Sequence, residues 1–341
     1  MSSLLSSVRG HGDPAADTGY EDHPPRMGFF TDTSLCIGCK ACEVACKEWN
    51  EVPEDGLNFT GMSFDNSQGL SADTWRHVAF IEQRKPVGDS QANFQRGLAT
   101  LVDLGLDSPS TPSVPSAPAF LPSLPASPSG PAPSGLAPSA PAAPPGAEDG
   151  GLDGDFRWLM SSDVCKHCTD AACLDVCPTG ALFRTEFGTV VVQEDVCNGC
   201  GYCVPACPYG VIAKREEDGR VFKCTLCYDR LGEGMEPACA KACPTSSIQF
   251  GELEELRERA GGRVEQLQQA GVTDARLYGH DPSDGVGGDG AFFLLLDEPE
   301  VYGLPPDPVA TTRDLPRMWR HAALAAGCLA GGVAASLLGR R

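Results

Sequence analysis

Positively charged residues are scarce in this 341-residue chain. It has 26 lysines and arginines against 46 aspartates and glutamates, which gives a formal net charge of −20 at pH 7. A chain with this balance is repelled by the phosphates of nucleic acids and by anionic lipid headgroups. The composition therefore argues against nucleic acid and against anionic lipid surfaces as partners.

Recognisable catalytic signatures are missing as well. Gly285, Gly287 and Gly290 match G-x-G-x-x-G, but the sequence predicts no strand before them and no helix after them. We therefore expect a turn there and not a dinucleotide site. No flavin or molybdenum signature and no nucleophile–base pair stands out in the chain. The sequence thus predicts no catalytic residue and a protein that is not an enzyme by itself.

The first residues lack the features of an export signal, namely a basic start, an apolar run and a twin-arginine pair. If the protein works outside the cytoplasm, we expect it to travel folded on a partner that carries the signal. Residues 1–28 are polar and are expected to form a flexible tail.

Charge is absent from one long internal stretch. Residues 108–147 hold no charged residue and no cysteine, and consist mainly of Pro, Ala, Ser and Gly. Such a stretch cannot bury enough apolar surface to offset its ordering entropy. We therefore expect a disordered, low-complexity insertion over residues 86–152 that loops out of the domain.

Cysteine, by contrast, is abundant, and 16 of the 17 cysteines fall into four sets of four. The sets are Cys36/Cys39/Cys42/Cys46, Cys165/Cys168/Cys173/Cys177, Cys197/Cys200/Cys203/Cys207 and Cys224/Cys227/Cys239/Cys243. The first and third sets have the spacing C-x2-C-x2-C-x3-C, and the other two lengthen its middle gap. Only Cys328 stands outside the sets.

This spacing is that of bacterial ferredoxins that hold [4Fe–4S] clusters. Three thiolates within one tight loop can bind three irons of one cubane, and the fourth, on the helix that follows, reaches the neighbouring cluster. Pro178, Pro208 and Pro244 each follow a fourth cysteine, as in the ferredoxin run. We therefore predict four [4Fe–4S] clusters as cofactors. Disulfides and structural zinc are the alternatives.

The two-cluster ferredoxin layout also predicts which cysteines share a cluster. Sets two and three follow each other closely, so the fourth cysteine of each should bind the cluster of the other. The two outer sets are left to pair by elimination. The predicted clusters are Cys36/Cys39/Cys42/Cys243 (cluster 1), Cys46/Cys224/Cys227/Cys239 (cluster 2), Cys165/Cys168/Cys173/Cys207 (cluster 3) and Cys177/Cys197/Cys200/Cys203 (cluster 4). Closure of each set on its own cluster remains the alternative.

Local patterns predict several elements around the cysteines. Strands are expected at 74–83 and 154–160, the second resuming the first after the insertion, and a hairpin between sets two and three is expected to turn at Gly188. The apolar residues of 253–267 predict a packing helix that is broken at Gly261–Gly262. Five lysines close to the cysteine loops are expected mostly at the surface: Lys40, Lys47, Lys166, Lys214 and Lys223.

The C-terminus reads as a candidate transmembrane helix. Residues 322–339 carry no charge and, as a helix, would span roughly 27 Å, just enough for the hydrocarbon core of a bilayer. Gly327 and Gly331 form a G-x-x-x-G step that suits packing on another membrane helix. A peripheral or buried terminal helix is the alternative, and arginines at both ends leave the orientation open.

Several of these stretches together resemble a known family. They are CIGCKACEVACKEWN, GYCVPACPYG, RVFKCTLCYDR, EPACAKACPT and VYGLPPDP, the last one shortly before the terminal apolar helix. In these the chain resembles the iron–sulfur (beta) subunit of membrane-bound respiratory formate dehydrogenases. More broadly, it is similar to the four-cluster electron-transfer subunits of the molybdopterin oxidoreductase family.

The resemblance implies an α+β fold of two pseudo-symmetric dicluster ferredoxin-like halves with a C-terminal transmembrane helix. The expected divisions are a tail (1–28), the first part of the ferredoxin-like domain (29–85), the insertion (86–152), the second part (153–250), a C-terminal extension (251–316) and the candidate membrane helix (317–341).

The resemblance also implies partners and a place in the cell. The partners would be a catalytic molybdopterin alpha subunit that oxidises formate and a membrane gamma subunit with haem b that passes electrons to quinone. The chain would carry electrons between them, held at the cell membrane by its terminal helix, with its globular part outside the cytoplasm. The same role in another molybdopterin oxidoreductase or in a hydrogenase complex is the alternative.

Overall fold

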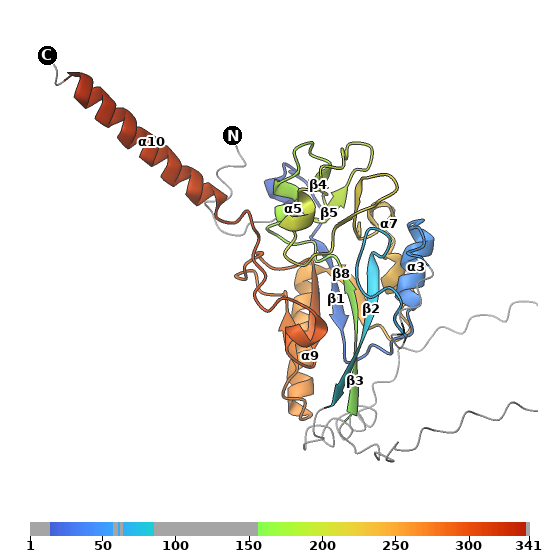
Figure 1. Cartoon of the computed structure of the whole chain (residues 1–341). Coiled ribbons are helices and arrows are strands. Elements are labelled where there is room, and N and C mark those ends of the chain that lie inside the picture. Colours follow the sequence, from blue (N-terminus) through green and yellow to red (C-terminus); the bar gives the residue numbers. More distant parts are fainter. Residues whose placement is uncertain (1–13, 57–60, 62–63, 85–155, 339–341) are drawn as a thin grey trace, which may run out of the picture.

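The computed structural model describes residues 14–56, 61, 64–84 and 156–338 (Figure 1). The insertion expected at 86–152 lies outside these residues, as do residues 1–13 of the expected tail. The rest of that tail begins with a one-turn helix, α2 (Pro14–Asp17), in which Ala15 is fully buried. This part of the expected tail is therefore packed.

A four-stranded mixed sheet forms the centre of the protein, with the strand order β8-β1-β10-β9. The inner strands β1 (Met27–Asp32) and β10 (Ala291–Leu295) run parallel, although they come from opposite ends of the chain. The outer strands β8 (Ile248–Glu252) and β9 (Arg276–Tyr278) each pair antiparallel with an inner neighbour. Every residue of β10 is buried, so this strand lies at the core.

One long helix, α9 (Leu253–Gln269), follows β8 directly and packs along the sheet (Figure 1). Its buried residues Leu253, Leu256, Ala260 and Leu267 recur at helical spacing and contact aromatic residues of β1 and β10. The predicted break at Gly261–Gly262 is wrong, because the helix runs through both glycines. The packing of the apolar face on either side of them outweighs the roughly 1 kcal/mol by which each glycine disfavours a helix.

We expect Leu256→Ala to lower the stability of the folded protein by about 2–5 kcal/mol, because it removes a side chain that is only 1 % exposed against the sheet. Thermal unfolding under anaerobic conditions measures this as a lower midpoint. Glu258→Ala, on the exposed face of the same helix, is the matched control and should leave the midpoint nearly unchanged. Equal shifts in both variants would contradict the packing of α9 described above.

The other strands of the described residues form three two-stranded hairpins. They are β2 (Arg76–Arg84) with β3 (Phe156–Val164), β4 (Leu182–Arg184) with β5 (Val190–Val192), and β6 (Ala213–Lys214) with β7 (Val221–Phe222). The predicted turn at Gly188 is confirmed, with φ at +74°. The expectation that β3 resumes β2 is wrong, because β3 returns antiparallel along β2. The two arms of this hairpin therefore flank residues 85–155.

Short helices connect the strands, and four of the five carry cysteines of the sets. They are α3 (Ala41–Trp49), α5 (Ala172–Asp175), α6 (Cys203–Ala206), α7 (Tyr228–Gly232) and α8 (Ala238–Lys241). The chain ends with a single-turn 3₁₀ helix, η1 (Pro299–Tyr302), and the long helix α10 (Leu315–Leu338), which projects away from the rest of the molecule (Figure 1). The mixed content of helix and strand agrees with the predicted α+β class, and the pseudo-symmetry of two halves stays a prediction.

Candidate metal centres

The same backbone bend recurs at the start of all four cysteine sets. The residue just before the second cysteine has a positive φ in each set, at +64° for Gly38, +48° for His167, +71° for Gly199 and +58° for Leu226. A glycine is needed at Gly38, since a Cβ there would lie 2.6 Å from a ring carbon of Phe80. The four C-x2-C segments thus share this positive φ despite different sequences.

Helices hold five of the remaining cysteines. Cys42 and Cys46 lie four residues apart on α3, which places both on the same buried face of that helix. Cys173, Cys203 and Cys239 lie on α5, α6 and α8 in the same way. Cys177, Cys207 and Cys243 follow within two residues of the ends of α5, α6 and α8.

Two groups of four thiols each surround a cavity. Cys36, Cys39, Cys42 and Cys243 line one of them, together with apolar residues such as Ile37 and Val78. The second cavity is lined by Cys165, Cys168, Cys173 and Cys207. In both cavities the fourth cysteine comes from a different set than the first three.

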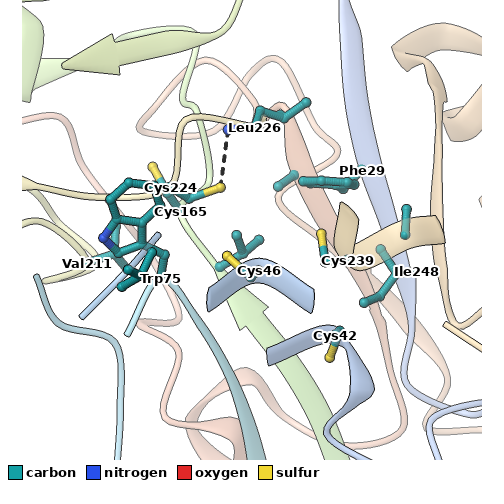
Figure 2. Packing of buried hydrophobic residues seen from close by; sticks show 14 of the residues in the cluster. Phe29, Cys42, Cys46, Trp75, Cys165, Val211, Cys224, Leu226, Cys239 and Ile248 are labelled. Carbon is teal, nitrogen blue, oxygen red and sulfur yellow. Dashed lines mark hydrogen bonds between the residues drawn. The ribbon is translucent and has the colours of Figure 1, made fainter. Parts of the chain in front are cut away.

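The other two groups are evident from the mutual influence of their thiols. Burial raises the pKa of the Cys46 thiol, and its neighbours Cys224, Cys239 and Cys227 raise it further. Figure 2 shows Cys46, Cys224 and Cys239 in the same part of the core. Burial likewise raises the pKa of Cys203 to about 11, with contributions from Cys177, Cys200 and Cys197. The structure thus brings together four thiols in each of four places.

The chemistry of these groups fits [4Fe–4S] clusters. All 17 cysteines are free, so no disulfide competes for them. Within the described part of the chain, no three His, Cys, Asp or Glu side chains converge closely enough to bind one metal ion. A single zinc requires sulfurs at about 2.3 Å from one point, whereas a cubane carries its irons at separate corners and accepts thiols spread around a cavity. Burial raises the pKa of thiols such as Cys46 and Cys203, so iron binding to these thiols must release protons.

The four groups adjoin one another in a row. The pKa of the Cys42 thiol is raised by burial and also by Cys239, which belongs to the next group. Cys224 and Cys165 form the next such pair, and the pKa of Cys224 is raised to about 12 by burial and by Cys165. Cys173 and Cys203 form the last pair. Burial is again the main cause that raises the pKa of Cys173, to about 12, and Cys203 contributes. Neighbouring groups therefore approach each other through single cysteines.

Polar residues that the sequence did not single out also reach the thiols. The side-chain amide of Asn50 lies 3.7 Å from the Cys46 sulfur and 3.8 Å from the Cys227 sulfur. The Ser162 hydroxyl shares a hydrogen bond of 3.2 Å with the Cys42 sulfur. The only available signal for Asn50 was its position one helical turn after Cys46, and Ser162 had none.

The expectation that the lysines lie mostly at the surface is wrong for two of them. Lys166 is fully buried, forms an ion pair with Asp163 and lies over the rings of Phe293 and Tyr209. Lys223 is also buried, and its ammonium donates to backbone carbonyls, one of them that of Cys224 at 3.0 Å. Both line the cavity around Cys165, so two positive charges lie beside this group of thiols.

The helix α10 has the length and composition of a membrane span. Residues Arg317–Leu338 have a mean hydropathy of 1.6, and none of this segment is buried within the protein. A core helix would pack its apolar residues against the body, so the alternative of a buried terminal helix is excluded. By length and composition alone, α10 is a candidate transmembrane helix.

The cysteine loops, the hairpins between them and the four groups of thiols define a ferredoxin-type iron–sulfur protein. Comparison with protein families agrees, since residues 156–253 match the 4Fe–4S dicluster domain and residues 33–49 match a 4Fe–4S binding domain. The two matches cover the segments that hold all 16 cysteines of the four sets.

Similar proteins define the family more closely. The chain is 33 % identical to the iron–sulfur subunit of the nitrate-inducible formate dehydrogenase of Escherichia coli (strain K12), over 85 % of this chain and 76 % of that protein. It is 34 % identical to the formate dehydrogenase iron–sulfur subunit of Haemophilus influenzae, over 84 % and 71 %. The B subunit of the anaerobic dimethyl sulfoxide reductase of E. coli is 30 % identical, over 69 % and 78 %. The chain belongs to the family of formate dehydrogenase iron–sulfur subunits.

Proposed function

We propose that the chain binds four [4Fe–4S] clusters and relays electrons from a formate-oxidising molybdopterin subunit to a membrane subunit with haem b. The row of four thiol groups carries this proposal, because each group meets the next through a cysteine of each: Cys42 with Cys239, Cys224 with Cys165, and Cys173 with Cys203. When bound, each cluster supplies a one-electron redox centre. The order along the row is cluster 1, 2, 3 and 4.

The protein around the row has two tasks. Aromatic and aliphatic residues such as Phe29, Trp75 and Leu226 pack between the thiols and keep water out (Figure 2). Backbone groups hold the sulfurs in place, as where the N–H of Leu226 donates to the Cys224 sulfur at 3.3 Å. A dry, fixed environment of this kind limits the reorganisation that accompanies a change of charge.

Each end of the row has one exposed cysteine, whereas all four cysteines of the second group are buried. Cys39, in the first group, and Cys200, in the last, are the exposed cysteines of the four sets. An exposed apolar residue accompanies each, Ile37 beside Cys39 and Tyr202 beside Cys200. Exposed apolar residues next to the end cysteines suit contact with partner subunits, one at either end.

Contacts before α10 support a place for the membrane subunit. Ala310 packs with Ala172 and Ala206, which flank Cys173 and Cys207 of the third group. Thr312 donates to the Asp175 carboxylate at 2.5 Å, which attaches the segment just before α10 to α5. We therefore assign the half with clusters 3 and 4 to the membrane side and cluster 1 to the catalytic subunit.

Metal analysis of the full chain, purified without oxygen, tests the cluster proposal. We expect about 16 iron and about 16 labile sulfide per chain, because each cubane holds four of each. The protein should be brown and should give paramagnetic signals after reduction with dithionite. Zinc without labile sulfide, or a colourless protein without signals, would contradict the proposal.

A second function is favoured by the similarity to the B subunit of the dimethyl sulfoxide reductase. The same row would then carry electrons in the opposite direction, from the membrane to a reductase. Purification of the native complex, with identification of its subunits and of its electron donor, separates the two. A catalytic subunit that reduces with quinol, and that does not oxidise formate, would favour the second function.

A further inference from the structure

One buried arginine lies where the first two thiol groups meet. Arg76 begins strand β2 and is only 2 % exposed. Its guanidinium lies over the Phe29 ring, 4.9 Å from the centroid, in the part of the core that also holds Cys42, Cys46, Cys224 and Cys239. These four thiols are also the charges that most strongly raise the pKa of Arg76 against the effect of burial.

The guanidinium has unused hydrogen-bond donors. Its Nη1 donates to the Ser162 carbonyl at 3.2 Å and to the Ser162 hydroxyl at 3.1 Å. Its Nε and Nη2 are buried and find no acceptor among the residues that the structure describes. Nor do those residues give it a carboxylate within ion-pair distance. A buried cation without a counter-charge or acceptors is strongly unfavourable, so an anionic group is expected beside it.

We propose that Arg76 is a tuning residue of the relay, which stabilises the added negative charge when clusters 1 and 2 are reduced. This inference rests on the cluster assignment proposed above. Thiolate-bound clusters carry negative charge, so they supply the missing counter-charge. A fixed positive charge and hydrogen bonds to sulfur favour the reduced form and therefore raise the reduction potential.

Arg76 reaches the two clusters by different routes. Three of its four neighbouring thiols, Cys239, Cys224 and Cys46, belong to cluster 2, so the unused Nε and Nη2 act there. The route to cluster 1 leads through Ser162, whose hydroxyl accepts from Arg76 and donates to the Cys42 sulfur. Ser162 is therefore a positioning residue for cluster 1, and the two routes can be separated by substitution.

The test is a redox titration of the full-length chain, purified without oxygen and followed by electron paramagnetic resonance. We expect Arg76→Gln to lower the potential of two of the four clusters, with a change of at least about tenfold in the reduction equilibrium of cluster 2, or about 59 mV for one electron. Ser162→Ala should shift only one of these two. Arg76→Lys, which keeps the charge but loses the planar fork, should shift them less than Arg76→Gln.

Arg157→Gln is the matched control. Arg157 lies on β3 at the far end of the same hairpin, opposite Gln83, about 23 Å along the strand from Arg76, and it pairs with Asp297. This variant should leave all four potentials unchanged. Unchanged potentials in Arg76→Gln, or equal shifts of all four clusters, would overturn the proposal. If Arg76→Gln does not retain its iron, an unshifted Ser162→Ala overturns it. Iron and sulfide contents of the unmodified chain test the cluster proposal separately.

Discussion

Replacing Cys46 and Cys239 together by serine is expected to remove one cluster and to leave about 12 of about 16 iron atoms per chain. Both thiols belong to the same group although they come from different sets, so the second substitution should cost no further iron. Replacing Cys46 together with Cys36 should remove two clusters and leave about 8 iron atoms. These two cysteines belong to one set, but the structure places them in different groups.

Iron analysis of the two double variants therefore distinguishes pairing across sets from closure of each set on itself. If each set closed its own cluster, the two outcomes would be exchanged. Cys328→Ser is the control, because Cys328 lies exposed on α10 and should leave the iron content unchanged. Loss of cluster 2 should also lower the rate of electron transfer between the two ends of the row. The decrease should be much larger than the roughly 10–100-fold loss that is typical when a residue supporting a metal ligand is replaced.

The cysteine framework could be predicted from the sequence because its chemistry is local. Three thiolates of one loop can bind the same cubane only at a few spacings, so C-x2-C-x2-C identifies both these ligands and the loop. The hairpin β4–β5 was predictable for a similar reason, since the positive φ at Gly188 is a local requirement of its turn. Local backbone geometry of this kind can be predicted from the residue types alone.

Long-range pairing was not predictable in the same way. Strand β1 pairs in parallel with β10, with Phe30 opposite Phe292, and no local pattern links two segments so far apart. The residues of β2 and of β3 each predict a strand, but no local pattern shows that the two strands pair antiparallel. Contacts of this kind are selected by burial of the whole core.

Buried charges were the other failure of sequence reasoning. Lys166, Lys223 and Arg76 were expected at the surface or were not considered, because charged residues are almost never fully buried unless they are paired. Lys166 is paired with Asp163, and the clusters proposed above would place anionic groups beside all three side chains. Such groups are not part of the amino-acid sequence. A protein that carries many negative clusters can bury positive side chains that another protein would expose.

The second large effect is expected at the candidate transmembrane helix α10. Leu329 is exposed near the middle of Arg317–Leu338, where an arginine would be placed in the hydrocarbon core. The substitution Leu329→Arg costs about 2.5–3.5 kcal/mol at that depth, which corresponds to about a 60- to 300-fold loss in membrane insertion. Met318→Arg at the start of the same helix is the control, since the side chain there can reach the headgroup region. Fractionation of cells after a carbonate wash measures the share of chain retained in the membrane.

Gly331→Leu separates attachment to lipid from attachment to a partner helix. Gly327 and Gly331 lie on one face of α10, and Leu329 lies on the opposite face, because successive helical residues are turned by about 100°. The substitution makes the helix more apolar, so the chain should stay in the membrane fraction. It prevents the close approach of a second helix that small residues allow, so less of a membrane subunit should copurify with the chain.

The Leu329→Arg variant also has an outcome that contradicts a membrane span. If it stays in the membrane fraction as the unmodified chain does, α10 is held there by contacts with protein alone and does not span the bilayer.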